Sequence, residues 1–510
     1  MTSSASIRQL LDSDTNSPFL PVDTEISETQ RRVPLIDSDD ATPADVSQCE
    51  LRAPDPILST IHFVPPEIWA QIFIYAYLDI FRISWVCGAW RRIVLSLPAL
   101  WDMVSLDVNE SETSTATGQG IAHTWIKRSG DRFISVVLHH DRPVLRADIT
   151  RVKAFLEALP DKERWRNVSL RPQMLALLFD SHEQEHGSSW GGLEELAIYD
   201  VLEAEAQPIY PVTPQFPDSV SLRHLTSLRC LTLSNLSTRF FTTTLLPYAQ
   251  LTYLHLNIIG ELTEHLLILG HCMALENCII SHSRPRPGSF MGNVNAQSSQ
   301  ALFIRTIVLP RLHRLVLNGD GSQSLSLFLR KFTLPSLEAL GIIERGQTRG
   351  RRAYPRPCYD LIGMLDRSEC SLRTLEMHNS STSNDGELVS LFERLAHLIV
   401  LRISAIGVQP ILNDNIMRRL ISKTSCVSTL LPRLTTLEVR CRWDQEILTR
   451  GSLKDFFNAR AAIDLHTLPT FIVPLRNVMI TGSEPHPLVI SPLLAEMYTP
   501  FTGALEDYEL

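Results

Sequence analysis

The sequence contains no long apolar run and no Cys-x-x-Cys motif. No segment approaches the roughly 20 consecutive apolar residues that a helix needs to cross a bilayer, and the start, MTSSASIRQLL, is unlike a secretory signal. The nine cysteines are scattered along the chain, a pattern typical of reduced thiols. We therefore expect a cytoplasmic and/or nuclear protein that has no membrane partner.

A strong excess of one charge is also missing. The chain has 47 Lys and Arg against 56 Asp and Glu, a net charge of −9 over 510 residues. This modest value argues against broad binding to nucleic acid. Neither a Gly-x4-Gly-Lys-Ser/Thr phosphate loop nor a dinucleotide fingerprint occurs. We expect no nucleic-acid partner and no cofactor.

Catalytic and metal-binding patterns are weak. The run Gly187–Gly191 has the Gly-x-Ser-x-Gly spacing, but it lacks the strand before and the helix after that such an elbow requires. His271, Cys272, Cys278 and His282 have metal-ligand side chains, but their spacing is not a compact zinc pattern. Cys278 occupies an apolar strand position, which predicts a core role. We predict no catalytic residue, no metal site and no enzymatic activity.

The stretch from residue 62 to 106 has two apolar stripes at helical spacing. Pro65-Pro66-Glu67 predicts a helix start, with proline in the first turn and a carboxylate near the positive helix end. The first stripe contains Ile68, Trp69, Ile72, Phe73 and Ala76, and the second contains Ile83, Val86, Cys87, Trp90, Val94 and Leu97, with Arg82, Arg91 and Arg92 largely off it. Two helices of this length cannot cover their own apolar surface, so we expect them to pack on each other and on something else.

Several pieces of this stretch resemble an F-box of the kind that precedes leucine-rich repeats. They are Pro65 to Ile68, Ile72-Phe73, Val86-Cys87, Trp90-Arg91, Ile93, and Leu97 to Trp101. The resemblance implies docking on a Skp-type adaptor and, through it, on a cullin. The adaptor-binding residues that it implies are Pro65, Pro66, Glu67, Ile68, Ile72, Phe73, Ile83, Val86, Cys87, Trp90 and Ile93. The linker at residues 77–82 is shorter than usual, and Gly88 weakens the second helix by roughly 1 kcal/mol relative to alanine. The alternative is a helical hairpin that only caps the next domain.

From residue 101 onward the chain repeats the pattern apolar-x-x-apolar-x-apolar. The repeats are Trp101-Val104-Leu106, Phe133-Val136-Leu138, Trp165-Val168-Leu170, Leu193-Leu196-Ile198, Leu228-Leu231-Leu233, Leu251-Leu254-Leu256, Leu275-Cys278-Ile280, Leu312-Leu315-Leu317, Leu337-Leu340-Ile342, Leu372-Leu375-Met377, Leu398-Leu401-Ile403, Leu434-Leu437-Val439 and Leu475-Val478-Ile480. The last two positions of each repeat are two residues apart, so they lie on one side of a strand.

Helix-like segments lie between these strands, at 149–159, 323–332, 361–366, 388–396 and 453–462. Strand, turn, helix and turn make the unit of a leucine-rich solenoid, in which each unit leaves an apolar edge that only its neighbour can bury. The spacing of the units is irregular, roughly 23 to 41 residues, against about 20–29 in standard leucine-rich repeats. We therefore predict an α/β solenoid, an irregular leucine-rich-repeat horseshoe. The alternative is an α/β domain with another kind of parallel sheet.

The expected domain organisation follows from these patterns. Residues 1–56 are rich in Ser, Thr, Asp and Pro, which predicts a disordered N-terminal tail. Residues 57–106 form the F-box-like helical domain, and residues 107–125 a polar linker. The solenoid takes residues 126–485, and residues 486–510 form a C-terminal cap or tail.

The predicted function is that of a substrate-recognition subunit of an SCF-type ubiquitin ligase. In this hypothesis the solenoid binds an unknown protein client with strand residues that point away from the core, and with an arginine-rich loop at 344–357. The candidate client-binding residues are Tyr253, His255, Arg314, Arg349, Arg351, Arg352 and Arg402. The alternative is an interaction scaffold that does not engage a ligase, and the loop is alternatively a solvated insertion.

Overall fold

The computed structural model describes part of the chain and divides it into two compact units. The described residues are 64–75, 80–107, 112–139, 156, 159, 161–179, 190–199, 220–236, 240, 244–259, 263–283, 306–319, 322–344, 357–378, 385–405, 414–421, 430–441 and 477–482. The first unit comprises residues 1–93 and 505–510, and the second comprises residues 94–504. The expected disordered tail (1–56) and C-terminal cap (486–510) lie outside the described residues.

The first unit contains three helical segments where we expected two. They are α3 (Pro66–Tyr75), α4 (Ile80–Val86) and α5 (Gly88–Ser96), the last of which continues into the second unit. The predicted second helix is interrupted at Cys87, whose carbonyl accepts a hydrogen bond from the Arg91 N–H at 3.0 Å. Gly88 is the first residue of α5 rather than an interior residue, so its low helix propensity favours the break.

Three aromatic rings hold α3 against α5. The ring centroids of Trp69 and Trp90 are 4.6 Å apart, and those of Phe73 and Trp90 are 5.1 Å apart in an edge-to-face arrangement. Such pairs add roughly 0.5–1.5 kcal/mol to the gain from burial. Ile80 and Ile83 of α4 are also buried. The first unit therefore has a small core of its own.

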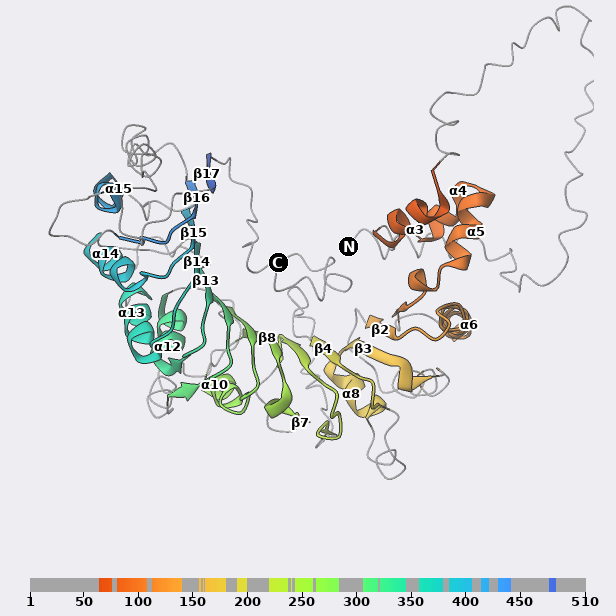
Figure 1. Ribbon diagram of the computed structural model, residues 1–510. Helices are drawn as coiled ribbons and strands as arrows, with labels where there is room; N and C mark the ends of the chain where they lie inside the picture. Colours follow the sequence, from red (N-terminus) through yellow and green to blue (C-terminus); the bar gives the residue numbers. More distant parts are fainter. Residues whose placement is uncertain are drawn as a thin grey trace, which may run out of the picture. The chain divides into compact units, whose positions relative to one another are not determined.

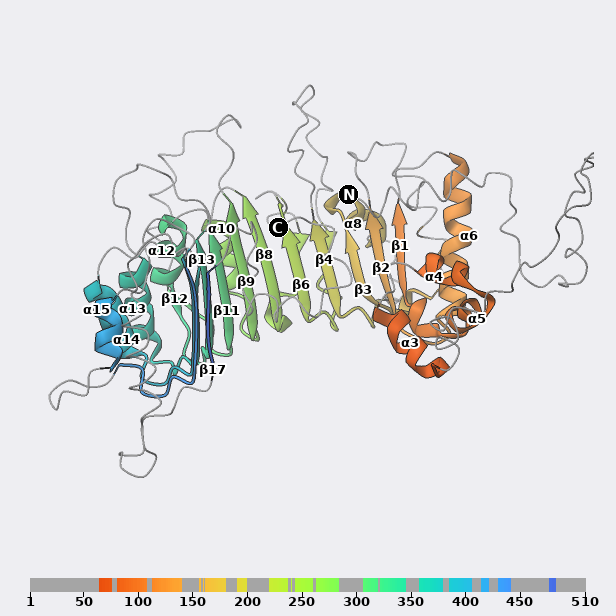
Figure 2. The same cartoon turned by 90° about the horizontal axis from the view of Figure 1, so that it is seen from above.

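Among the described residues, the second unit is built on a sheet of 13 strands that are all parallel. Figures 1 and 2 show this sheet from two directions. The strands are β1 (Met103–Asp107), β2 (Ile134–His139), β3 (Trp165–Leu170), β4 (Glu195–Tyr199), β6 (Cys230–Ser234), β8 (Tyr253–Ile259), β9 (Asn277–Ser283), β11 (Arg314–Gly319), β13 (Ala339–Glu344), β14 (Thr374–His378), β15 (Val400–Ala405), β16 (Thr436–Cys441) and β17 (Asn477–Gly482). Their order in the sheet follows the chain, and each one contains the last two positions of one sequence repeat. The α/β class and the parallel sheet are thus confirmed.

The repeats also align across the strands. Leu254 of β8 lies opposite Leu231 of β6 and Cys278 of β9. The next inward position, Leu256, lies opposite Leu233 and Ile280 in the same way. These side chains are buried, so two apolar rows cross the sheet on one face. Cys278 is part of the first row, which confirms its predicted core role.

A single turn precedes many of the strands. The Leu312 N–H donates to the Leu309 carbonyl at 3.4 Å, and the Leu337 N–H donates to the Leu334 carbonyl at 3.2 Å. Proline follows the first residue of both turns, at 310 and 335, where its fixed φ angle favours this conformation. After the first turn the backbone N–H groups of residues 313–314 donate to the Glu276 carbonyl of the preceding repeat. After the second turn those of residues 338–339 donate to the His313 carbonyl. The turns therefore fix where each strand begins.

Helices cover the face of the sheet that carries the apolar rows. They include α8 (Pro172–Leu178), α10 (Thr263–Leu269), α12 (Ser322–Lys331), α13 (Pro357–Ser368), α14 (Asp385–Arg394) and α15 (Asp414–Ile421). Figure 1 shows α8, α10, α12, α13 and α14 on the same side of the strands. Their buried apolar side chains share one core with those of the strands. The helices predicted near 323–332, 361–366 and 388–396 are present, whereas 453–462 and most of 149–159 are outside the described residues.

Short elements complete the second unit. The pairs β5 (Val220–Ser221) with β7 (Thr244–Leu245) and β10 (Ile307–Val308) with β12 (Phe332–Thr333) form two small parallel sheets. Three 3-10 turns lie at η2 (Pro98–Leu100), η3 (Lys162–Arg164) and η5 (Tyr248–Gln250). Among the described helices, none combines the length and hydropathy that a membrane crossing needs.

Two of the expected domain boundaries differ from the structure. The polar linker expected at 107–125 contains most of the helix α6 (Glu112–Arg128). Its residues Ala122 and Ile126 are buried one turn apart, so packing outweighs a sequence rich in Ser, Thr and Gly. The F-box-like domain was expected to end at 106, but β1 pairs with β2 and therefore belongs to the sheet.

Two adjacent glycines provide a test of the close contact between neighbouring repeats of the second unit. A Cβ atom on Gly192 would lie 2.6 Å from the Glu163 carbonyl oxygen, whereas one on Gly191 would meet nothing within 4 Å. Neither residue has a positive φ angle. We expect Gly192→Ala to lower the free energy of unfolding by roughly 1–3 kcal/mol, because backbone must shift, and Gly191→Ala to change it by less than about 1 kcal/mol. Urea unfolding followed by circular dichroism measures both; equal effects would contradict this packing.

Candidate functional site

The first unit exposes a group of large apolar side chains on α3 and α4. We name Ile68, Ile72, Trp85 and Val86 the helical apolar surface; they are 51, 46, 51 and 61% exposed. Ile68 and Ile72 are four residues apart and therefore lie on one face of α3. Single exposed apolar residues are common on proteins. Here four of the ten large hydrophobic residues that are exposed among the described residues occur within 19 positions, and such concentration is typical of binding sites.

The predicted adaptor-binding residues divide into surface and core. Pro65, Pro66, Glu67, Ile68, Ile72, Val86 and Cys87 are exposed, Trp90 and Ile93 are partly buried, and Phe73 and Ile83 are buried. Phe73 and Ile83 therefore hold the helices together. The sequence prediction missed Trp85, which is exposed on the side of α4 away from Ile80 and Ile83. A separate helical wheel for 80–86 would have placed it there, but that requires knowing that the helix breaks at Cys87.

The exposed charged residues of α3, α4 and α5 are mostly positive. Arg82, Arg91 and Arg92 are exposed. Glu67 is the single acidic residue among the described residues 64–75 and 80–93. Exposed apolar and cationic residues on these three helices fit a partner that combines apolar and acidic residues.

The other face of the sheet carries the residues that alternate with the apolar rows. Its middle row includes Thr232, His255, Val316 and Glu376, and all of these are buried. Among the candidate client-binding residues, Tyr253 and His255 are only 5 and 6% exposed, whereas Arg314 is exposed and Arg402 is partly exposed. The expected open surface is therefore absent at Tyr253 and His255. Arg349, Arg351 and Arg352 lie outside the described residues.

Arg402 links two carboxylates on this face. Its Nη1 atom is 2.6 Å from Glu376 Oε1, and its Nε atom is 3.1 Å from Glu438 Oε1. The three residues are register partners on β14, β15 and β16. Burial alone would lower the pKa of Arg402, but hydrogen bonds and charges from Glu376 and Glu438 outweigh burial and raise it. Because Glu376 is fully buried, this pairing offsets the cost of burying its charge.

The thiols and the serine motif give no support for catalysis. Burial raises the pKa of the Cys272 thiol to about 12. The pKa of the Cys358 thiol is also raised to about 12, mainly by burial and to a smaller extent by the negative charges of Glu387 and Glu344. Such thiols stay protonated at neutral pH and are poor nucleophiles and metal ligands. Within the described part of the chain no three His, Cys, Asp or Glu residues are placed to hold a metal ion. Most of the Gly187–Gly191 motif, including Ser189, lies outside that part.

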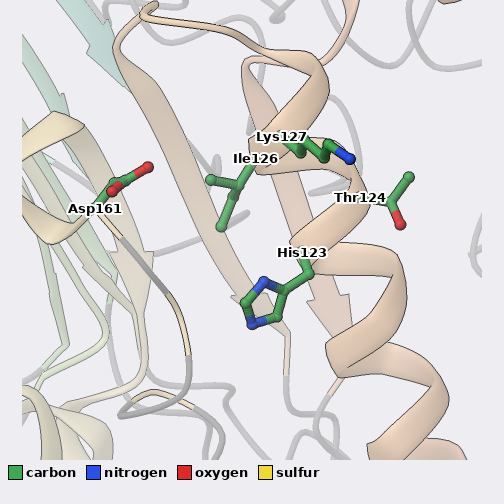
Figure 3. A pocket seen from close by; sticks show the side chains of 5 residues that line it. All are labelled: His123, Thr124, Ile126, Lys127 and Asp161. Carbon is green, nitrogen blue, oxygen red and sulfur yellow. The ribbon is translucent and has the colours of Figure 1, made fainter.

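A hollow beside α6 is lined by His123, Thr124, Ile126, Lys127 and Asp161 (Figure 3). His123, Lys127 and Asp161 are exposed, and Ile126 is buried. In Figure 3 the ammonium group of Lys127 points away from Asp161. The hollow therefore does not bring these two charges together as an acid–base pair.

The comparisons with known proteins identify no relative. No protein-family model matches the sequence, and a search of the curated proteins finds no match. The functional argument therefore depends on the residues and contacts of this chain.

The buried His255 predicts a measurable loss of stability in acid. Burial lowers its pKa from 6.5 to about 4, so below pH 6.5 the unfolded chain binds a proton that the folded chain does not. The free energy of unfolding should fall as pH decreases from 6.5 to about 4, by roughly 2–3 kcal/mol in total. Urea unfolding at pH 7 and pH 4.5 measures the change.

Two variants test whether His255 causes the loss of stability in acid. His255→Asn should reduce the pH-dependent loss by that amount, whereas the exposed His271→Asn should leave it unchanged. If His255→Asn retained the full pH dependence, the assignment of this loss to His255 would be wrong.

Proposed function

We propose that this protein is the substrate-recognition subunit of an SCF-type ubiquitin ligase. Residues of α3, α4 and α5 dock on a Skp-type adaptor and, through it, on a cullin. The second unit binds a protein client. The observation that carries this proposal is the helical apolar surface, which lies within the stretch that resembles an F-box.

The helical apolar surface can supply the free energy of docking. Burying apolar area contributes about 25 cal/mol per Å², so covering four half-exposed side chains contributes several kcal/mol. Trp85 is the largest of the four, and tryptophan is enriched among the residues that dominate binding energies. The exposed Arg82, Arg91 and Arg92 favour an acidic partner over a basic one.

The second unit fits the role of a client-binding domain if it is a leucine-rich-repeat-like solenoid. Thirteen parallel strands in chain order support that interpretation, because a solenoid adds one strand from each successive unit. Leucine occupies one or both inward positions in most strands. Such an array is long in one direction and can contact an extended protein segment.

In this proposal the protein positions its client and performs no bond chemistry. Holding the client and the ligase on one chain raises the local concentration of client near the transferring enzyme. Burial keeps the thiols of Cys272 and Cys358 protonated, so these two side chains are poor candidates for a nucleophile that would compete with this interpretation.

Substitutions on the helical apolar surface test adaptor docking. Ile72→Asp and Val86→Asp should each weaken capture of a purified Skp-type adaptor by the full-length chain at least tenfold, because a carboxylate in the interface loses hydration without gaining a partner. Both residues are exposed, so the variants should keep the thermal midpoint of the wild type. Trp90→Ala is less informative, because Trp90 packs against Trp69 and Phe73.

A matched control separates docking from a general effect of the substitution. Leu267→Asp places the same change on an exposed residue of α10 in the second unit and should leave adaptor capture unchanged. Equal capture by wild type, Ile72→Asp and Val86→Asp would exclude docking through this surface. It would favour an interaction scaffold that does not engage a ligase.

A further inference from the structure

We draw no further inference here: the strongest candidate, the row of Ile279, Val316, Gly341 and Glu376 on the face of the sheet opposite the helices, is buried, and nothing in the described part of the chain shows what covers it.

Discussion

A strand with two apolar residues on one side cannot bury them by itself. This constraint explains both the register of the strands and the layer of helices in the second unit. In each strand these residues are two positions apart, and in the sheet they lie opposite the equivalent residues of both neighbours. A register shift of one residue would turn both of them to the other face. The apolar rows therefore fix the register, and the helices α8, α10, α12, α13 and α14 cover those rows.

The same constraint separates two kinds of surface. Residues that alternate with the apolar rows lie on the other face, where Glu376, Arg402 and Glu438 of neighbouring strands carry charges that pair with one another. The first unit cannot bury all of its apolar side chains, because α3, α4 and α5 are too short to cover them. Its core is an aromatic cluster, and Ile72, Trp85 and other apolar residues remain exposed. The exposed apolar area of the first unit is the feature that supports a partner.

Local periodicity was enough to predict the strands. Each repeat encodes its own strand, and parallel neighbours then follow from the chain order, so the inward positions such as Leu315 and Leu340 were correctly predicted. The helix α6 was missed, because its sequence has low helix propensity and depends on Ala122 and Ile126 packing in the core. The break at Cys87 was missed for a related reason, since the apolar stripe continues across it.

The burial of Tyr253 and His255 also could not be predicted from the sequence. Alternation along a strand shows which side a residue faces, but whether that side is covered depends on the tertiary structure. The network of Glu376, Arg402 and Glu438 required the register of β14, β15 and β16. Sequence spacing of 26 and 36 residues between its members gives no sign of that contact.

Amide hydrogen exchange of the intact chain tests the central claim most directly. If the apolar rows hold the strands in register, the amides of residues 253–259, 277–283, 314–319 and 339–344 should exchange at least a thousandfold more slowly than those of an unfolded chain of the same sequence. Exchange of these four strands at the rate of an unfolded chain would contradict the account.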